Sequence, residues 1–558
     1  MFNRKVLFSF EAVALVVGAV AYFLLVRYFD TRWRFMPYTF AFTFAFSAIV
    51  FLATKRVVFS LYTAGTIVIL LAIVSAVKFR LKGLALHLFD FVFTGTDAAT
   101  VKFLLANYTS IGVLSLLAVA IAIGCLTFLY RRERPLRFRW RAGAPAFVVA
   151  FATAYAAHPS HDPREADFLP YVAGYNASAF PLSFANVPDM IGWVPLARKF
   201  DHIDGSVAMA NTADCGADRS KPDFMMILSE SQSSPLVFPE LSFPKAVTDS
   251  YRSDDGTIKP LYVETVGGGT WMTNFTVLTS LSSADFGWQA AYVTRVLDGR
   301  IKGALPEVLA RCGYRTITVM PMPTIAFNEG PFLKSIGFQE VFGAETTGHE
   351  PMSVRDKVYF DYVNALIEKH RKEDGRPLFI AIQTMFTHAP YESVLLPEPK
   401  EPASHYNKSA DLNEYMRRIA LARQDLQAFL GKRKAEPGPR GTLVMEFGDH
   451  QSVATRDMVL SSSPENLLTD LRSKIYETYY AVHAYDTPID FSGLDQPEDA
   501  TFLIPRLIAA AKLPTSPKYR DLVALSDHCL GRFHTCEDRI SVDRHLKGLV
   551  AGGLLWVE

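Results

Sequence analysis

Residues 224–231 read FMMILSES, an apolar run that ends in a hydroxyl, a carboxylate and a second hydroxyl. A short apolar run bounded by polar residues is typical of a strand buried on both faces of a sheet. Four more such runs follow, at 261–266, 316–320, 378–384 and 442–447. Helical stretches lie between several of them, at 302–314, 354–372 and 413–433. Strands that alternate with helices predict an α/β domain with a mostly parallel sheet between helices.

The composition places this domain in a larger, partly apolar chain. The 558 residues are 50% hydrophobic and 20% charged, with a formal net charge of +1. This length allows two to four domains, and the balanced charge gives no support for a nucleic-acid partner. With 42 Phe and 23 Tyr the chain can bury a large core, which argues against disorder. A mean hydropathy of +0.14 is high for a soluble enzyme, so the apolar excess should be localised.

That excess lies in the first 157 residues. Five apolar runs occur there, at about 7–26, 36–53, 57–77, 111–130 and 142–157. A helix needs about 20 apolar residues to cross the hydrocarbon layer, which the first four runs satisfy well and the shorter fifth less well. The first run is interpreted as a retained span and not a signal peptide, because it is long and no small-residue cleavage site follows it.

Positive charge predicts how these spans are oriented. With five spans, the basic clusters at 4–5, 55–56 and 131–141 all fall on the cytoplasmic side. The layout, without eukaryotic targeting features, predicts a multi-pass protein of the bacterial inner (cytoplasmic) membrane, with its catalytic domain on the periplasmic or extracytoplasmic side. Residues 83–108 are interpreted as an interfacial amphipathic helix, with a plain loop as an equal alternative.

The expected domains are a transmembrane domain (1–157), a linker that wraps the catalytic domain (158–222) and the catalytic domain (223–558). The linker is rich in Pro, Asp, Asn and Gly. Four cysteines outside the membrane suggest two disulfides, and three pairings are possible. The local pair is Cys529–Cys536, which would leave Cys215–Cys312.

Polar groups directly follow four of the predicted strands. Glu230 follows the first run, Gly267-Gly268-Gly269-Thr270 the second, His388 the fourth, and Asp449-His450 the fifth. In open α/β sheets, ligands bind beyond the carboxyl ends of the strands. Because Glu, Asp and His together offer oxygen and nitrogen ligands, this set suits a divalent metal ion.

Thr270 is the favoured nucleophile among these residues. It is expected to begin a helix, where free N–H groups favour an alkoxide and an incoming phosphate oxyanion. A metal ion on its oxygen would lower its pKa. Thr273 and Ser231 are rival nucleophiles, whereas a Ser-His-Asp site lacks a GxSxG elbow.

The order and spacing of these motifs resemble the sulfatase-like branch of the alkaline phosphatase superfamily. Within it, the chain resembles the membrane-anchored lipoteichoic acid synthases, osmoregulated-glucan phosphoglycerol transferases and phosphoethanolamine transferases. The resemblance covers about 220–485 and rests on FMMILSESQS, GGGTWMTNF, TMFTHAPYE and MEFGDHQ. It implies that Thr270 is the nucleophile and that His388 binds substrate. It also implies one divalent ion (Mn, Zn or Mg), held by Glu230, Thr270, Asp449 and His450.

One stretch departs from the synthase pattern. FNEGPFLKSIGF resembles the region where the synthases carry Trp-Asn-Arg to hold glycerol phosphate, but here it reads Phe327-Asn328-Glu329. Asn328 and Glu329 are therefore expected to bind substrate. Because Glu329 replaces a cation with an anion beside a phosphate site, phosphoglycerol is in doubt, and a protonated amine would suit it better. Asn274 also replaces an acidic residue of the pattern.

The expected function is transfer of phosphoethanolamine or phosphoglycerol from a membrane phospholipid to a glycan or lipid acceptor, through a covalent phospho-threonine. The alternative is a hydrolase, either a phosphodiesterase or a sulfatase-type enzyme, with water as the acceptor. Residues 270–273 lack the CxPxR or SxPxR motif of classical sulfatases, which argues against sulfate esters. A third hypothesis is a non-enzymatic sensor that keeps a decayed site. The complete set of Glu, Thr, Asp and His site residues argues against it.

Overall fold

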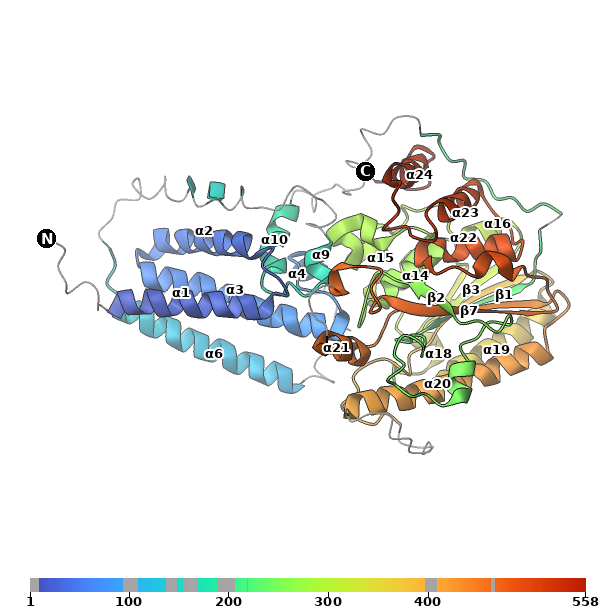
Figure 1. The fold of residues 1–558 in the computed structure, drawn as a ribbon, viewed down its shortest axis with the longest axis horizontal. Coiled ribbons are helices and arrows are strands. Elements are labelled where there is room, and N and C mark those ends of the chain that lie inside the picture. The colour runs from blue at the N-terminus through green and yellow to red at the C-terminus, as the bar shows by residue number, and fades with distance from the viewer. Residues whose placement is uncertain are drawn as a thin grey trace. The chain divides into compact units, whose positions relative to one another are not determined.

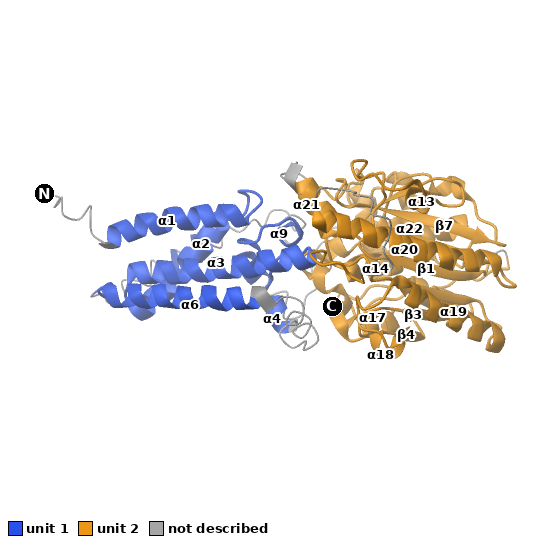
Figure 2. Cartoon of the chain, turned by 90° about the horizontal axis from the view of Figure 1, so that it is seen from below, with its two compact units in different colours: residues 1–191 blue, residues 192–558 orange. Residues whose placement is uncertain are grey.

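The computed structural model divides into two compact units, residues 1–191 and 192–558 (Figures 1 and 2). It describes residues 10–93, 109–136, 148–149, 151–153, 156, 168–187, 206–217, 219–396, 409–462 and 467–557. The boundary between the units falls inside the expected linker.

Unit 1 contains four described helices that are long and apolar enough to cross a membrane. They are α1 (Phe10–Phe29), α2 (Met36–Thr54), α3 (Val57–Lys82) and α6 (Thr109–Arg132). The first four predicted runs are therefore helical. The fifth, 142–157, lies largely outside the described residues, as does most of the expected interfacial helix, of which α4 (Phe89–Phe93) is described.

The start of α3 and the end of α6 meet in unit 1. The Glu133 carboxylate, just after α6, accepts hydrogen bonds from the backbone N–H groups of Val58 (3.0 Å) and Phe59 (2.7 Å). Arg56 Nε donates to the Glu133 carbonyl at 3.1 Å. Glu133 thus supplies partners for N–H groups that a helix start leaves free. The basic pairs that precede α3 and end α6 gather at one end, as the orientation rule requires.

Part of the expected linker belongs to unit 1. Residues 168–187 form α9 (Leu169–Val172), α10 (Ala179–Ser183) and a 3₁₀ turn, η2 (Phe184–Asn186). The buried carboxylate of Asp30 accepts the N–H groups of Ala177 (2.8 Å) and Ser178 (3.2 Å). A buried carboxylate needs such partners, so this segment is tied to the end of α1.

Unit 2 is built on one eight-stranded sheet in the order β4-β3-β5-β1-β6-β7-β2-β8. The five strands β4, β3, β5, β1 and β6 are parallel to one another. Strand β7 runs antiparallel to both of its neighbours, β6 and β2. This confirms the predicted α/β domain with a mostly parallel sheet. The strands are β1 (Asp223–Ser229), β2 (Lys259–Tyr262), β3 (Arg315–Val319), β4 (Glu340–Phe342), β5 (Leu378–Gln383), β6 (Thr442–Gly448), β7 (Glu477–Tyr485) and β8 (Glu498–Asp499).

Two helices cover one face of this sheet. Apolar side chains of α19 (Asp356–Glu373) and α20 (Ala410–Ala435) form one buried cluster with those of β1, β3, β5 and β6. The other face carries α14 (Thr270–Thr279), α16 (Leu305–Arg311) and α22 (Ala500–Ala510) (Figure 1). In register, Ser229 pairs with Gly448 and Leu228 with Gln383. The carboxyl ends of β5, β1 and β6 therefore lie side by side.

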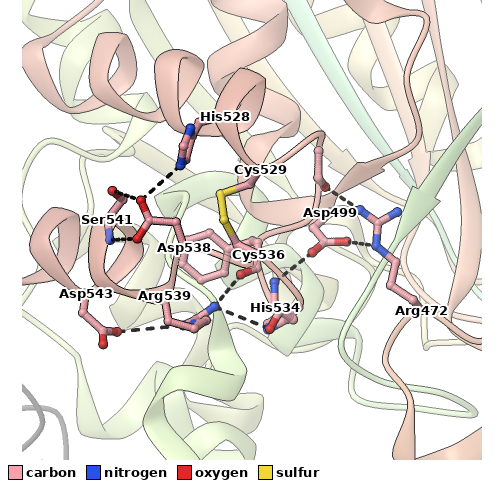
Figure 3. Close-up of a disulfide and its surroundings, with 12 residues drawn as sticks. Arg472, Asp499, His528, Cys529, His534, Cys536, Asp538, Arg539, Ser541 and Asp543 are labelled. Atoms are coloured by element: carbon pink, nitrogen blue, oxygen red, sulfur yellow. Dashed lines mark hydrogen bonds and ion pairs between the residues drawn. A yellow bond between two sulfur atoms is a disulfide. The ribbon is translucent and has the colours of Figure 1, made fainter.

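Both expected disulfides are present as Cys215–Cys312 and Cys529–Cys536. The second joins the end of α23 (Pro517–His528) to the loop before α24 (Arg539–Ala551) (Figure 3). In that loop Asp538 accepts the N–H of Ser541 at 3.1 Å and so caps α24.

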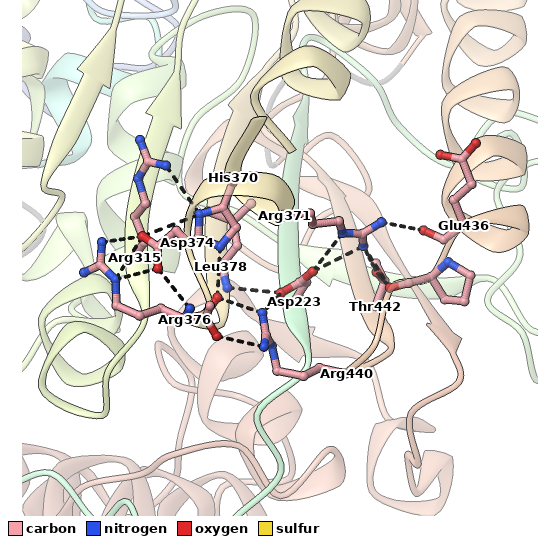
Figure 4. A network of polar contacts seen from close by, with 12 residues as sticks. Asp223, Arg315, His370, Arg371, Asp374, Arg376, Leu378, Glu436, Arg440 and Thr442 are labelled. Carbon is pink, nitrogen blue, oxygen red and sulfur yellow. Dashed lines mark hydrogen bonds and ion pairs between the residues drawn. The ribbon is translucent and has the colours of Figure 1, made fainter. Parts of the chain in front are cut away.

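The amino ends of the strands carry a separate polar network (Figure 4). Buried Asp223, at the start of β1, accepts hydrogen bonds from Arg371 Nη2 and from the N–H of Leu378, both at 3.2 Å. Arg440 adds an ion pair at 3.7 Å. These contacts tie β1 to β5 and α19 at the edge opposite the candidate site, so they serve the fold.

Candidate active site

The carboxyl ends of β1 and β6 place three potential metal ligands together. Ligand atoms of Glu230, Asp449 and His450 all lie within 4.8 Å of one another, and all three residues are buried. Asp449 Oδ1 accepts the N–H groups of Ser231 (2.7 Å) and His450 (2.8 Å). Asp449 Oδ2 is buried and has no hydrogen-bond partner among the described residues. A buried oxygen without a donor is costly unless a cation meets it, which suits a metal ligand.

The ring orientation of His450 also suits a metal ion. Its Nδ1 lies 3.0 Å from the Gln451 carbonyl, which can only accept, so Nδ1 carries the proton. In the neutral ring Nε2 then has a free lone pair, and it lies 3.2 Å from Asp449 Oδ2 and 3.8 Å from Glu230 Oε1. A backbone carbonyl that sets the tautomer of a metal-binding His is a common arrangement.

The pKa shifts of these three groups also favour a bound cation. Burial raises the pKa of Asp449 to about 7, and burial together with the Asp449 charge raises the pKa of Glu230. Burial also lowers the pKa of His450. Each group is driven toward its neutral form in the protein alone. A divalent cation would stabilise both carboxylates and favour the neutral imidazole. The donor set therefore fits a divalent ion.

Thr270 is the first residue of α14 and points into this cluster. Its Oγ1 donates to Glu230 Oε2 at 3.0 Å and lies 3.4 Å from His450 Nε2. The preceding Gly269 has a φ of +88° and provides no side-chain cap. The first N–H groups of a helix without such a cap are available to an anion. The half-buried Thr270 hydroxyl is thus partly accessible and close to the candidate metal ligands. It also lies at a helix start that can bind an oxyanion.

The loop before Thr270 requires glycine. Gly267 has a φ of +71°, and a Cβ there would lie 2.7 Å from Arg456 Nη1. Its N–H donates to the Gln451 carbonyl at 2.9 Å. This bond couples the glycine loop to the segment that carries Asp449 and His450. The strand predicted at 261–266 was too long at its end. Strand β2 ends at Tyr262, and the loop that leads to Thr270 begins after it.

The two rival nucleophiles are more deeply buried than Thr270. Thr273 is buried, and its hydroxyl donates to the Asp449 carbonyl at 2.7 Å. The Ser231 hydroxyl donates to Glu230 Oε1 at 2.7 Å. Both hydroxyls bind residues of the candidate metal cluster, and of the three only Thr270 is partly exposed, which favours Thr270 as the nucleophile.

His388 lies in the loop after β5, and no sequence pattern predicted which residues hold this loop in place. The buried Arg418 of α20 donates to the carbonyls of His388 (2.7 Å) and Pro390 (2.8 Å). Tyr391 donates to the Thr387 carbonyl at 2.7 Å, and the Thr387 hydroxyl bonds the Glu230 carbonyl. The loop is therefore joined to the metal-site strand. Arg418 was missed because it looks like an ordinary charge on an amphipathic helix.

The two remaining predicted substrate residues differ in their surroundings. Asn328 Nδ2 donates to the Thr294 carbonyl (2.9 Å) and to Asp298 (3.1 Å), so its amide nitrogen is engaged in the fold. Glu329 is 5% exposed, and its Oε1 accepts hydrogen bonds from Asn274 (2.9 Å) and Gln383 (2.7 Å). Gln383 was not expected at the site, although its place at the end of β5 is the signal that could have found it.

A known protein family matches the part of the chain that carries the candidate site. Residues 222–482 match the Sulfatase family model. This confirms the resemblance read from the motifs, and the matched range contains Glu230, Thr270, His388, Asp449 and His450.

Individual proteins are more distant. An uncharacterized protein of Haemophilus influenzae is 25% identical over 334 residues, which is 55% of this chain and 58% of that protein's length. Among solved structures, this chain is similar to the phosphoglycerol transferase GacH of Streptococcus pyogenes, with 18% identity, a TM-score of 0.46, and coverage of 60% of this chain and 88% of that one. It is also similar to the lipooligosaccharide phosphoethanolamine transferase A of Neisseria meningitidis, with 12% identity, a TM-score of 0.49, and coverage of 87% and 96%.

Proposed function

We propose that this chain transfers a phosphorylated head group, phosphoethanolamine or phosphoglycerol, from a membrane phospholipid to a glycan or lipid acceptor. The observation that carries this proposal is the Thr270 hydroxyl, which lies at the start of α14 and within hydrogen-bonding reach of Glu230 and His450. A hydroxyl in this position can attack phosphorus while the helix end stabilises the charge on the phosphoryl oxygens. The names of similar transferases agree with this reaction.

The reaction has two balanced halves. First, Thr270 Oγ bonds to phosphorus, the bond from phosphorus to the diacylglycerol oxygen breaks, and the threonine proton ends on the released diacylglycerol hydroxyl. Second, an acceptor hydroxyl attacks the phospho-threonine, and its proton returns to Thr270. We assign substrate binding to His388, whose loop is joined to the Glu230 strand through Thr387. Splitting the transfer in two lets donor and acceptor use the same site.

One divalent ion (Mn, Zn or Mg) would be held by Glu230, Thr270, Asp449 and His450. When bound, it would lower the pKa of the Thr270 hydroxyl and offset the charge of the phosphate diester. The residues themselves orient the hydroxyl: Glu230 accepts its hydrogen bond, and Gly269 lets the chain turn into α14.

A lipid donor is consistent with the four apolar helices of unit 1. We place the protein in a bacterial inner membrane, with the sulfatase-family domain on the periplasmic side. Two disulfides in unit 2 support an oxidising compartment.

The test uses the full chain in phospholipid vesicles with Mn²⁺, Zn²⁺ or Mg²⁺, and it measures diacylglycerol release. We expect release by the wild type, partial release by Thr270→Ser, which keeps a hydroxyl, and none by Thr270→Ala. Release of free head-group phosphate by Thr270→Ala at the wild-type rate would refute the transferase and favour a hydrolase with water as acceptor.

A further inference from the structure

The carboxylate of Glu329 is held on the reacting side of the site. Its Oε1 accepts from Asn274, which lies four residues after Thr270 and so on the same face of α14. It also accepts from Gln383, the last residue of β5, which is paired with Leu228 close to Glu230. Two neutral amides therefore fix one oxygen of Glu329 beside the nucleophile and the metal ligands.

The other oxygen has no partner among the residues that the structure describes. Glu329 forms no ion pair with any described residue, and its Oε2 accepts no hydrogen bond from one. Two other buried carboxylates of unit 2 lie against cations: Glu446 against Arg423 at 2.8 Å and Glu264 against His534 at 3.0 Å. Buried Asp356 has no cation and accepts two backbone N–H groups instead. A carboxylate buried without a cation is expensive, so a site that keeps one is prepared for a cationic ligand.

An aromatic pair joins the segment that carries Thr270 to the segment that carries Glu329. Trp271, which follows Thr270, stacks on Phe327 with ring centroids 4.4 Å apart and an interplanar angle of 10°. The indole N–H donates to the Ala291 carbonyl at 3.0 Å, which fixes the ring. Phe327 is only partly buried and precedes Glu329 by two residues. Aromatic faces attract cations, and a carboxylate with aromatic rings is a common pocket for an alkylammonium group.

We propose that Glu329, with the Trp271–Phe327 pair, binds the ammonium group of the donor lipid, so that phosphoethanolamine is transferred in preference to phosphoglycerol. This inference rests on the proposed function. In the step itself, the Thr270 Oγ–phosphorus bond forms and the bond to diacylglycerol oxygen breaks, as above. The ammonium keeps its protons throughout, and it forms an ion pair with Glu329 that an uncharged glycerol head group cannot form.

The first measurement compares transfer from vesicles doped with phosphatidylethanolamine or phosphatidylglycerol. A carboxylate–ammonium hydrogen bond contributes about 1.5–3 kcal/mol, or roughly 10- to 100-fold in rate. We expect the wild type to prefer phosphatidylethanolamine by that factor. Glu329→Gln, which keeps the shape and the amide contacts, should bring the ratio of phosphatidylethanolamine to phosphatidylglycerol transfer close to one. Equal use of both lipids by the wild type, or equal loss of both in the variant, would overturn the inference.

A binding measurement separates this inference from the proposed function. O-phosphoethanolamine and glycerol 1-phosphate are titrated into full-length Thr270→Ala loaded with Mn²⁺, with and without Glu329→Gln. Tighter binding of the amine, lost with Glu329→Gln, supports the ammonium site even if no lipid is turned over, in which case only the proposed function fails. Equal binding of both compounds overturns the ammonium site even if transfer occurs. A preserved Mn²⁺-induced rise in melting temperature shows that each variant is folded.

Discussion

Gly448→Ala should damage the site through one steric contact. Gly448 ends β6 and directly precedes Asp449, and an added Cβ would lie 2.0 Å from the Gln232 carbonyl oxygen. Carbon and oxygen normally approach no closer than about 3.3 Å. The β6 end and the Glu230–Gln232 segment must therefore separate by about 1 Å, and these segments carry the candidate metal ligands.

The expected magnitude follows from that displacement. Overpacking of a buried position costs about 1–3 kcal/mol. A misplacement of about 1 Å at a catalytic group can cost about 100-fold in rate. We expect Gly448→Ala to melt several degrees lower than the wild type and to release diacylglycerol about 100-fold more slowly. Thermal melting of the full chain and the vesicle assay measure the two effects.

Gly431→Ala is the matched control. Gly431 lies on the exposed side of α20, and an added Cβ there meets no described atom within 4 Å. Alanine is the better helix former by about 0.8–1.0 kcal/mol, so this variant should melt slightly higher and keep full activity. If Gly448→Ala matched the wild type in melting and rate, the close approach of β6 to Gln232 would be refuted.

Three further changes address the site and the fold. Asp449→Asn removes an anionic ligand, so Mn²⁺ affinity measured by calorimetry should fall at least about 100-fold, and an unchanged affinity would argue against the metal site. Arg418→Lys keeps the charge but not the planar guanidinium group that donates to the carbonyls of the His388 loop. Transfer should fall about 10- to 100-fold while the Mn²⁺ affinity stays unchanged. An equal fall in Mn²⁺ affinity would contradict a positioning role for Arg418. Burial lowers the pKa of Lys518 from 10.5 to about 7, so the unfolded chain binds the extra proton and stability should rise between about pH 7 and 10.5, by at most about 5 kcal/mol. Lys518→Met should melt higher at pH 7 and lack that rise, and a wild-type profile that is flat over this range would be the contrary result.

The sequence predicted the parts of the fold whose signal is local. Buried apolar runs located β1, β3, β5 and β6 to within a residue or two, because strands covered on both faces contain few polar positions. β4 and β8 contain three and two residues, too few for any periodic pattern. β7 reads ETYYAVHAY, where tyrosines and a histidine hide its burial.

The sequence predicted those parts of the candidate site whose positions follow from strand topology alone. Parallel strands bring Glu230 and Asp449 to one edge of the sheet, and a helix start after glycine places Thr270 against them. Contacts that depend on helix packing were not predictable. Gln383 on Glu329 and Arg418 under the His388 loop join segments far apart in the sequence, and no local pattern records such pairs.

The most direct test of the central claim is the mass of the peptide that contains Thr270. The full chain is incubated with Mn²⁺ and phosphatidylethanolamine vesicles without an acceptor, quenched in acid, and analysed by fragmentation that separates Thr270 from Thr273. We predict a phosphoethanolamine adduct on Thr270, absent in Thr270→Ala. An adduct on Thr273 or Ser231, or lipid turnover that proceeds at the wild-type rate in Thr270→Ala, would contradict the account.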